Sequence, residues 1–161
     1  MSNNGKPRIK IDRYQDPERI LHMTRRFEAA PEVLFDAWVR ARNARYWLFA
    51  TGADERYEAG FDARIGGRYH ITVRRKGFDF KAVGEYLEVE WPHRLVFTYG
   101  MPQFAPDFDH ISVELATDGE GCLMSFTQAG MPPDYRSATE EGWKRMFDLL
   151  EQALQTGLVP A

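Results

Sequence analysis

The side chains of this chain that could do chemistry are few, and none of them forms a recognisable catalytic or metal-binding set. The histidines are His22, His70, His93 and His110, and the one cysteine is Cys122. Zinc sites use histidines and cysteines at short, characteristic spacings, and no pair of these residues has such a spacing. No Lys or Arg lies within several residues of Cys122, so nothing nearby in sequence would stabilise a thiolate. We therefore expect no metal site, and a structural role for the cysteine.

The densest polar cluster is Asp107-Phe108-Asp109-His110. In an extended segment its two carboxylates would project to the same side, because side chains two residues apart share a face. Such a pair could bind a metal or carry out acid–base catalysis. The alternative is a solvated loop that enters a strand, and we favour that interpretation.

Motifs of the common enzyme classes are absent. Gly66-Gly67 is typical of a turn and matches neither of the glycine-rich phosphate-binding motifs. None of the serines lies in a G-x-S-x-G context. We assign no catalytic residue and no cofactor. The chain has 21 Lys and Arg against 24 Asp and Glu, a net charge of −3, which argues against a dedicated nucleic-acid-binding protein.

Aromatic side chains are the unusual feature of the composition, at 14% of all residues. Any one of them could simply belong to the core. Collectively they could line an apolar pocket of about 300–1,000 Å³, the usual size of a small-molecule site. We predict a pocket of this kind between the concave face of a sheet and the last helix. Its wall would consist of Trp38, Trp47, Tyr69, Ile71, Phe97, Tyr99, Trp143 and Phe147.

Hydrophobic periodicity predicts the elements that must position these residues. A polar arm over residues 1–18 precedes a strand that begins near Arg19. A helix opens at Pro31, and a second short helix covers residues 41–47. Alternating patterns then predict strands, which we list by number: 68–75, 78–90, 94–99, 109–116 and 122–128. The expected fold class is α+β, with a curved antiparallel sheet around a long C-terminal helix.

The C-terminal helix is the most strongly patterned element. Its apolar stripe has helical spacing and contains Trp143, Met146, Phe147, Leu150, Ala153 and Leu154. Ser137 and Glu140 fit a capping box at its start. Glu141 and Arg145 stand four residues apart, in the order that favours an ion pair. Gly157 is placed to end the helix.

Several segments of the chain resemble one known family. They are Arg25 to Pro31 with Val33 to Trp38, the pair Tyr46-Trp47, the turn Arg64 to Tyr69, the stretch Gly84 to Tyr99, and Glu141-Gly142-Trp143. Together they resemble the Hsp90 ATPase activator homologue family, in matching order, from about Arg19 to Gln155. The resemblance implies a helix-grip fold, as in START-like (SRPBCC) lipid-binding domains and polyketide cyclases, with a cavity between the sheet and the long helix. We expect one such domain over residues 19–157, with a tail at 158–161.

The resemblance carries over no catalytic residue, and the chain departs from the family at two positions. Many members have His where this chain has Gln128, and a His often stands where this chain has Glu141. If either histidine does chemistry in relatives, this chain lacks it.

Three functions remain open from the sequence. The first is a small-molecule-binding protein that holds an apolar or aromatic ligand. The second is a cyclase-like or hydrolase-like enzyme that uses polar residues such as Tyr69, His110 or Gln128. The third is a module that interacts with an Hsp90-type chaperone through its sheet surface. Edge strands would also permit a homodimer.

The expected location is the cytoplasm. A single cysteine cannot form an internal disulfide, which suits a reducing compartment. The first residues lack the apolar stretch of a signal peptide. No apolar run approaches the ~18 residues of a membrane span.

Overall fold

The computed structural model describes residues 11–51 and 55–161, and its main element is a seven-stranded antiparallel sheet. The strands are β1 (Ile20–Phe27), β2 (Arg56–Phe61), β3 (Arg68–Arg75), β4 (Phe78–Glu90), β5 (Arg94–Tyr99), β6 (Asp109–Asp118) and β7 (Gly121–Ala129). The helices are α1 (Pro31–Val39), α2 (Ala41–Ala44) and α3 (Arg136–Gln155), with short 3-10 turns at Pro17–Arg19 and Pro133–Tyr135. Across the sheet the strand order is β1-β7-β6-β5-β4-β3-β2.

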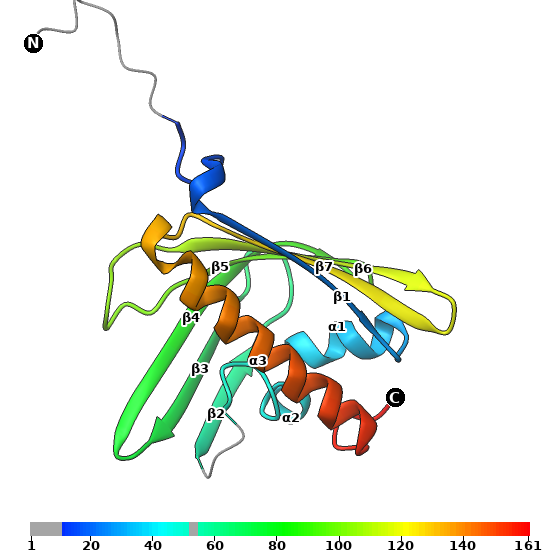
Figure 1. Ribbon diagram of the computed structural model, residues 1–161. Coiled ribbons are helices and arrows are strands. Elements are labelled where there is room, and N and C mark those ends of the chain that lie inside the picture. The colour runs from blue at the N-terminus through cyan, green and yellow to red at the C-terminus, as the bar shows by residue number, and fades with distance from the viewer. Residues whose placement is uncertain (1–10, 52–54) are drawn as a thin grey trace, which may run out of the picture.

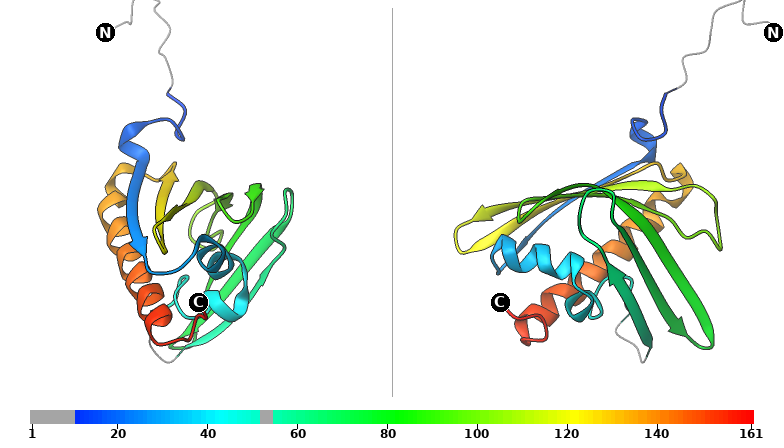
Figure 2. Two further views of the ribbon diagram at one scale, coloured as in Figure 1. Left: turned by 90° about the vertical axis from the view of Figure 1, so that its right-hand side faces the viewer. Right: turned by 180° about the vertical axis from the view of Figure 1, so that it is seen from behind.

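The sheet curves, and α3 runs diagonally across its concave side (Figure 1). The views from the side and from behind show α1 and α2 on the same side of the sheet as α3 (Figure 2). This is the helix-grip fold that the resemblance implies, with two short helices after the first strand. None of the helices among the described residues is both long enough and apolar enough to span a membrane.

The long strand β4 joins the two parts of the curved sheet. Its first half pairs with β3, its second half pairs with β5, and the register shifts between Tyr86 and Glu88. An irregularity of this kind increases the local bend of a strand. Gly84 lies just before the shift, where a Cβ atom would come within 1.8 Å of the Thr98 carbonyl oxygen and 2.5 Å of the Tyr69 ring. Only glycine allows the Tyr69 ring to cross the strand at this point.

The predicted strand faces on β3 and β5 are confirmed. Tyr69, Ile71 and Val73 on β3 are 5%, 1% and 1% exposed, and Leu95 and Phe97 on β5 are equally buried. Strand β2 is not among the predicted elements. Its central residues, Ala59 and Gly60, have low strand propensity, so the pattern is weak.

The predicted capping box at the start of α3 is wrong. The 3-10 turn at Pro133–Tyr135 leads directly into the helix, so α3 begins at Arg136 and Ser137 lies inside it. No side chain caps this end. The other end is as predicted, since Gly157 has φ = +78° and follows the last helical turn.

The end of the N-terminal arm packs onto the sheet. The Tyr14 ring stacks on His110 with 3.7 Å between centroids, and its hydroxyl donates to the Phe108 carbonyl oxygen at 2.8 Å. Arg13 forms ion pairs with Asp107 at 3.4 Å and Asp109 at 3.2 Å. These contacts fix the chain just before the first strand.

Candidate functional site

The space between the sheet and α3 contains a cavity of about 490 Å³, which we call the sheet–helix cavity. Its apolar wall is formed by Phe49, Ala50, Ile71, Val73, Phe80, Ala82, Met101, Met146 and Leu149, and Gly142, Thr51, Arg75, Arg145 and Asp148 complete the lining. The volume is in the range of small-molecule sites, and the wall has the mostly apolar character that such sites share.

The alternation of strand residues positions one wall of this cavity. Ile71 and Val73 lie on the inner face of β3, and Arg75 continues the same face by the two-residue period. Ala82 lies opposite Ile71, and Phe80 lies opposite Val73, on the neighbouring strand β4. The small side chain of Ala82 leaves room at the centre of this wall.

Helical spacing positions the other wall. Met146 lies four residues after Gly142, and Leu149 lies four residues after Arg145, so these four residues form one strip along α3. A Cβ atom at Gly142 would meet no heavy atom within 4 Å outside its own helix. Glycine in a helix interior costs about 1 kcal/mol relative to alanine. Gly142 therefore lowers the stability of α3 at a position that lines the cavity.

Arg75 is fixed in place at the cavity. Its Nε donates to Glu55 Oε2 at 2.8 Å, and its Nη2 donates to the Phe49 carbonyl oxygen at 2.6 Å. The guanidinium also lies 5.0 Å from the centroid of the Phe80 ring. The Glu55 carboxylate is only 7% exposed, so this ion pair is well shielded from water.

The eight residues of the predicted wall do come together, but mainly with one another. The Trp38 ring lies 4.6 Å from Trp47, 5.8 Å from Trp143 and 6.0 Å from Phe97, as centroid distances. Phe147 contacts both Trp47 and Trp143. These rings pack against one another and form an aromatic core, which leaves no large gap between them.

Of the eight, Ile71 lines the sheet–helix cavity, and the other seven do not. Trp38, Tyr69 and Phe97 border a separate void of about 10 Å³, no larger than about one water molecule. Tyr99 stacks on Phe49 with centroids 5.1 Å apart, so it contacts a residue that lines the cavity. The aromatic core thus lies beside the cavity.

Most residues that line the cavity are not among the predicted wall residues. Two features of the sequence point to them. Arg75 shares its strand face with Val73, and Arg145 and Leu149 form a strip beside the apolar stripe of the last helix. Both the strand face and the helix strip contain an arginine, so hydrophobic periodicity alone does not identify them.

A second, more polar pocket of about 270 Å³ lies where the arm meets the start of α3. Arg13, Arg19, Asp109 and Gln128 are among its lining residues. Gln128 is 2% exposed; its Nε2 donates to Asp109 Oδ2 at 2.8 Å, and its Oε1 accepts a bond from the indole of Trp143 at 2.7 Å. The acidic cluster is therefore partly buried and bonded, rather than wholly a solvated loop as the sequence suggested.

The groups considered for catalysis are each held by a partner outside the sheet–helix cavity. The Tyr69 hydroxyl donates to the Thr98 carbonyl oxygen at 2.7 Å, and burial raises the pKa of Tyr69 well above its usual range. His110 lies under the Tyr14 ring, and burial lowers its pKa. Gln128 bridges Trp143 and Asp109. Nothing in these contacts activates a nucleophile or a base toward the cavity.

The described residues contain no group of three or more His, Cys, Asp or Glu side chains that could hold a metal ion. The expectation that the chain needs no metal stays a prediction. Cys122 is fully buried and unpaired, and burial raises the pKa of its thiol to about 11. Such a thiol is a poor nucleophile at neutral pH.

Comparison with known proteins identifies the family of this chain. The family model described as Activator of Hsp90 ATPase homolog 1-like protein matches residues 28–155. The chain belongs to this family. No curated protein matches the sequence.

Solved structures share the fold of this member of the Activator of Hsp90 ATPase homolog 1-like family. An AHSA1-like protein from Aeromonas hydrophila superposes with a TM-score of 0.72 at 20% identity, covering 88% of this chain and 97% of that one. An Hsp90 activator from Plasmodium falciparum has a TM-score of 0.66 at 20% identity, with 85% and 96% covered. A protein from Chromobacterium violaceum reaches 0.74 at 23% identity, with 84% and 96% covered. These structural likenesses show the fold, a helix grip.

Proposed function

We propose that this protein binds a small, largely apolar molecule in the sheet–helix cavity. The observation that carries the proposal is the cavity itself, about 490 Å³ of apolar-walled space between β3, β4 and α3. Proteins rarely leave a large apolar surface open to water without a use for it, and such surfaces often mark binding grooves. A space of this size between the sheet and the long helix is therefore best explained by a ligand.

The interior glycine of α3 supports the same function. Gly142 opens onto the cavity, and alanine at this position would favour the helix without any clash. The seven predicted aromatic residues that do not line the cavity, from Trp38 to Phe147, would then hold its two walls apart as a rigid core. Ile71 would contact the ligand directly.

The test compares two substitutions at Gly142. Gly142→Leu places a branched side chain in the cavity, whereas Gly142→Ala adds one methyl group. Both should raise the thermal midpoint of unfolding, because both residues favour a helix over glycine. Binding of the neutral fluorophore N-phenylnaphthylamine is then titrated for the two variants and the wild type.

We expect Gly142→Ala to bind the fluorophore like the wild type and Gly142→Leu to bind it at least about tenfold more weakly, a difference of about 1.4 kcal/mol. Equal binding by all three proteins would show that the fluorophore sits elsewhere and would contradict the proposal. Native mass spectrometry of freshly purified protein complements this test by revealing any small molecule that copurifies.

A second candidate is a role as a chaperone-interacting module, since the family is named for activation of the Hsp90 ATPase and a similar structure is described as an Hsp90 activator. An exposed aromatic cluster favours it. Phe78 and Phe104 are 47% and 59% exposed, and both contact Phe80, with ring centroids 4.8 Å and 6.2 Å from it. Such clusters on a surface are typical of binding sites.

This candidate predicts that the protein raises ATP hydrolysis by a purified Hsp90, and that replacing Phe78 and Phe104 by Ser removes the effect. No stimulation by the wild type would dismiss it. A cytoplasmic location and a homodimer formed through an edge strand are part of the proposal as well. The location rests on the single unpaired cysteine, and the dimer rests on the edge positions of β1 and β2.

A further inference from the structure

The chemical class of the ligand can be read from the charges around the sheet–helix cavity, and this inference rests on the function proposed above. Three charged residues line the cavity: Arg75, Arg145 and Asp148. A charged group that already has an ionic partner offers little to a ligand, whereas an unpaired group can recognise the opposite charge. The partners of each residue therefore decide what the cavity selects.

Two of the three residues are already paired. Arg75 is held by the buried carboxylate of Glu55 at 2.8 Å. Asp148 accepts a hydrogen bond from Arg25 Nη1 at 2.7 Å, and Arg25 reaches across from β1 to α3 to make it. Both charges are therefore partly neutralised, although Arg25 also pairs with Glu151 at 3.1 Å.

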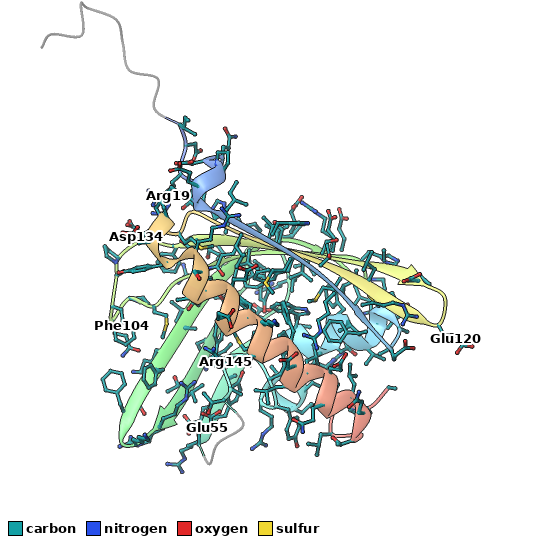
Figure 3. All side chains as sticks on the ribbon, in the orientation of Figure 1. Arg19, Glu55, Phe104, Glu120, Asp134 and Arg145 are labelled. Atoms are coloured by element: carbon teal, nitrogen blue, oxygen red, sulfur yellow. The ribbon has the colours of Figure 1, made fainter. Side chains whose placement is uncertain are left out.

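Arg145 differs from both of these residues. The sequence pattern predicts an ion pair with Glu141, but the guanidinium makes no hydrogen bond, ion pair or ring contact with any residue that the structure describes. Figure 3 shows Arg145 on the part of α3 that crosses in front of β2 and β3, above Glu55. It is exposed and lies at the rim of the cavity.

The cavity therefore has two chemically distinct parts. Its interior, lined by residues such as Val73, Ala82 and Leu149, is apolar and would exclude a charged group. Its rim carries one uncompensated positive charge with donors in a planar fork, which fits a carboxylate. A molecule that matches both parts has an apolar body and one anionic end.

We propose that the cavity binds an apolar carboxylic acid as its anion, with the hydrocarbon body against β3 and β4 and the carboxylate paired with Arg145.

The experiment measures how three naphthalene derivatives of one shape displace N-phenylnaphthylamine from the protein. They are naphthaleneacetic acid, naphthaleneethanol and naphthaleneethylamine, which are anionic, neutral and cationic at neutral pH. We expect the acid to bind about tenfold more tightly than the alcohol, the size of a partly solvated charge-assisted hydrogen bond. Raising the salt from about 0.1 M to about 1 M should remove most of this preference, because the Debye length falls from about 10 Å to about 3 Å.

Matched variants assign the preference to one side chain. Arg145→Gln should bind the alcohol as the wild type does and lose the preference for the acid. Lys144→Gln removes the same charge one residue away, at an exposed position that does not line the cavity, and should keep the preference. Arg145→Lys should retain part of it.

The outcomes separate this inference from the function on which it rests. If the fluorophore binds and the acid and alcohol displace it equally, or if the preference survives in Arg145→Gln, the inference is wrong and the binding function stands. Tighter binding of the amine would also overturn it and would point to Asp148 as the recognising group. If neither the fluorophore nor any derivative binds, the proposed function fails, and this inference fails with it.

Discussion

The indole of Trp143 donates a 2.7 Å hydrogen bond to the side-chain carbonyl of Gln128, and both side chains are 2% exposed. The bond joins α3 to β7 inside the core. Through its amide nitrogen Gln128 also binds Asp109, which Arg13 of the N-terminal arm holds from the other side. One buried amide therefore connects the last helix, the sheet and the arm, and it does so with both ends satisfied.

Trp143→Ala should lower the free energy of unfolding by about 3–5 kcal/mol, as removal of a large buried aromatic ring does. The ring contacts Phe126, Trp38 and Phe147 at centroid distances of 4.5–5.8 Å, so its loss leaves a cavity in the aromatic core. Urea denaturation measures the effect. A loss below about 1 kcal/mol would contradict the packing described here.

Gln128→Leu and Trp143→Phe should not be additive. Each single variant leaves a buried polar group of the other residue without its partner, at a cost of about 1–3 kcal/mol. In the double variant neither member of that pair remains, so the combined loss should be smaller than the sum by at least about 0.5 kcal/mol. A double-mutant cycle in urea measures this coupling, and strict additivity would show that the bond contributes nothing.

Stability should depend on pH through Asp109. Burial raises the pKa of Asp109 above 3.8, although the hydrogen bond from Gln128 and the charge of Arg13 oppose the rise. Between 3.8 and this raised pKa the folded state binds more protons than the unfolded state, so stability falls as pH rises through the interval. Above the raised pKa the loss is complete and constant.

Asp109→Asn lacks this titration and serves as the reference. The stability of the wild type minus that of Asp109→Asn should decrease with pH from below 3.8 up to the raised pKa, and then level off. Urea titrations of both proteins at a series of pH values give this difference. A difference that grows with pH would mean that the ion pair with Arg13 outweighs burial.

Cys122 should be inert in the folded protein. It is 0% exposed, and burial raises its pKa to about 11, so both access and thiolate formation are suppressed at neutral pH. Ellman's reagent should react with one thiol per chain in denaturant and with almost none in buffer. Rapid reaction in buffer would show that the hairpin of β6 and β7 opens.

Two glycines should respond to alanine in opposite directions. At Gly84 the new Cβ would lie 1.8 Å from the Thr98 carbonyl oxygen, so Gly84→Ala should destabilise the protein by about 3 kcal/mol or more. At Gly142 nothing lies within 4 Å of the new atom, and Gly142→Ala should stabilise by up to about 1 kcal/mol. Thermal unfolding of the pair measures both effects, and a shift of the same sign in both would contradict the assigned environments.

Much of the fold can be predicted from the sequence, because most of its strands and helices have a clear hydrophobic periodicity. The alternation Tyr69, Ile71, Val73 and the stripe from Trp143 to Leu154 each identify an element and its buried face. The strand β2 has no such pattern, and one reason is a contact with the neighbouring strand β3. A Cβ at Gly60 would lie only 2.6 Å from Cε1 of His70, so a larger residue would displace the His70 ring, and this contact is invisible along the sequence.

The site was harder to predict than the fold, since large inward-facing aromatics fill space as readily as they surround it. Trp38 and Phe147, which the pattern predicts as walls of a pocket, contact each other with ring centroids 6.4 Å apart, and whether such rings leave a gap depends on how they interlock. The cavity instead lies beside them, and small residues on its two walls, Gly142 on α3 and Ala82 on β4, line it. Likewise, the spacing of Glu141 and Arg145 permits an ion pair without requiring it, and the rotamer that leaves Arg145 free cannot be read from spacing.

The strand order has a consequence for synthesis of the protein. β1 leaves the ribosome before the other six strands of the sheet, but its only strand neighbour among the described residues is β7, and Ile20 pairs with Ala129. The following strand, β2, lies at the opposite edge of the sheet. The backbone of β1 therefore has no complete strand partner until β7 has been translated up to Ala129. Contacts so distant in sequence slow folding and leave an unpaired strand available to other chains, so nascent-chain protection is most needed for residues 20–27.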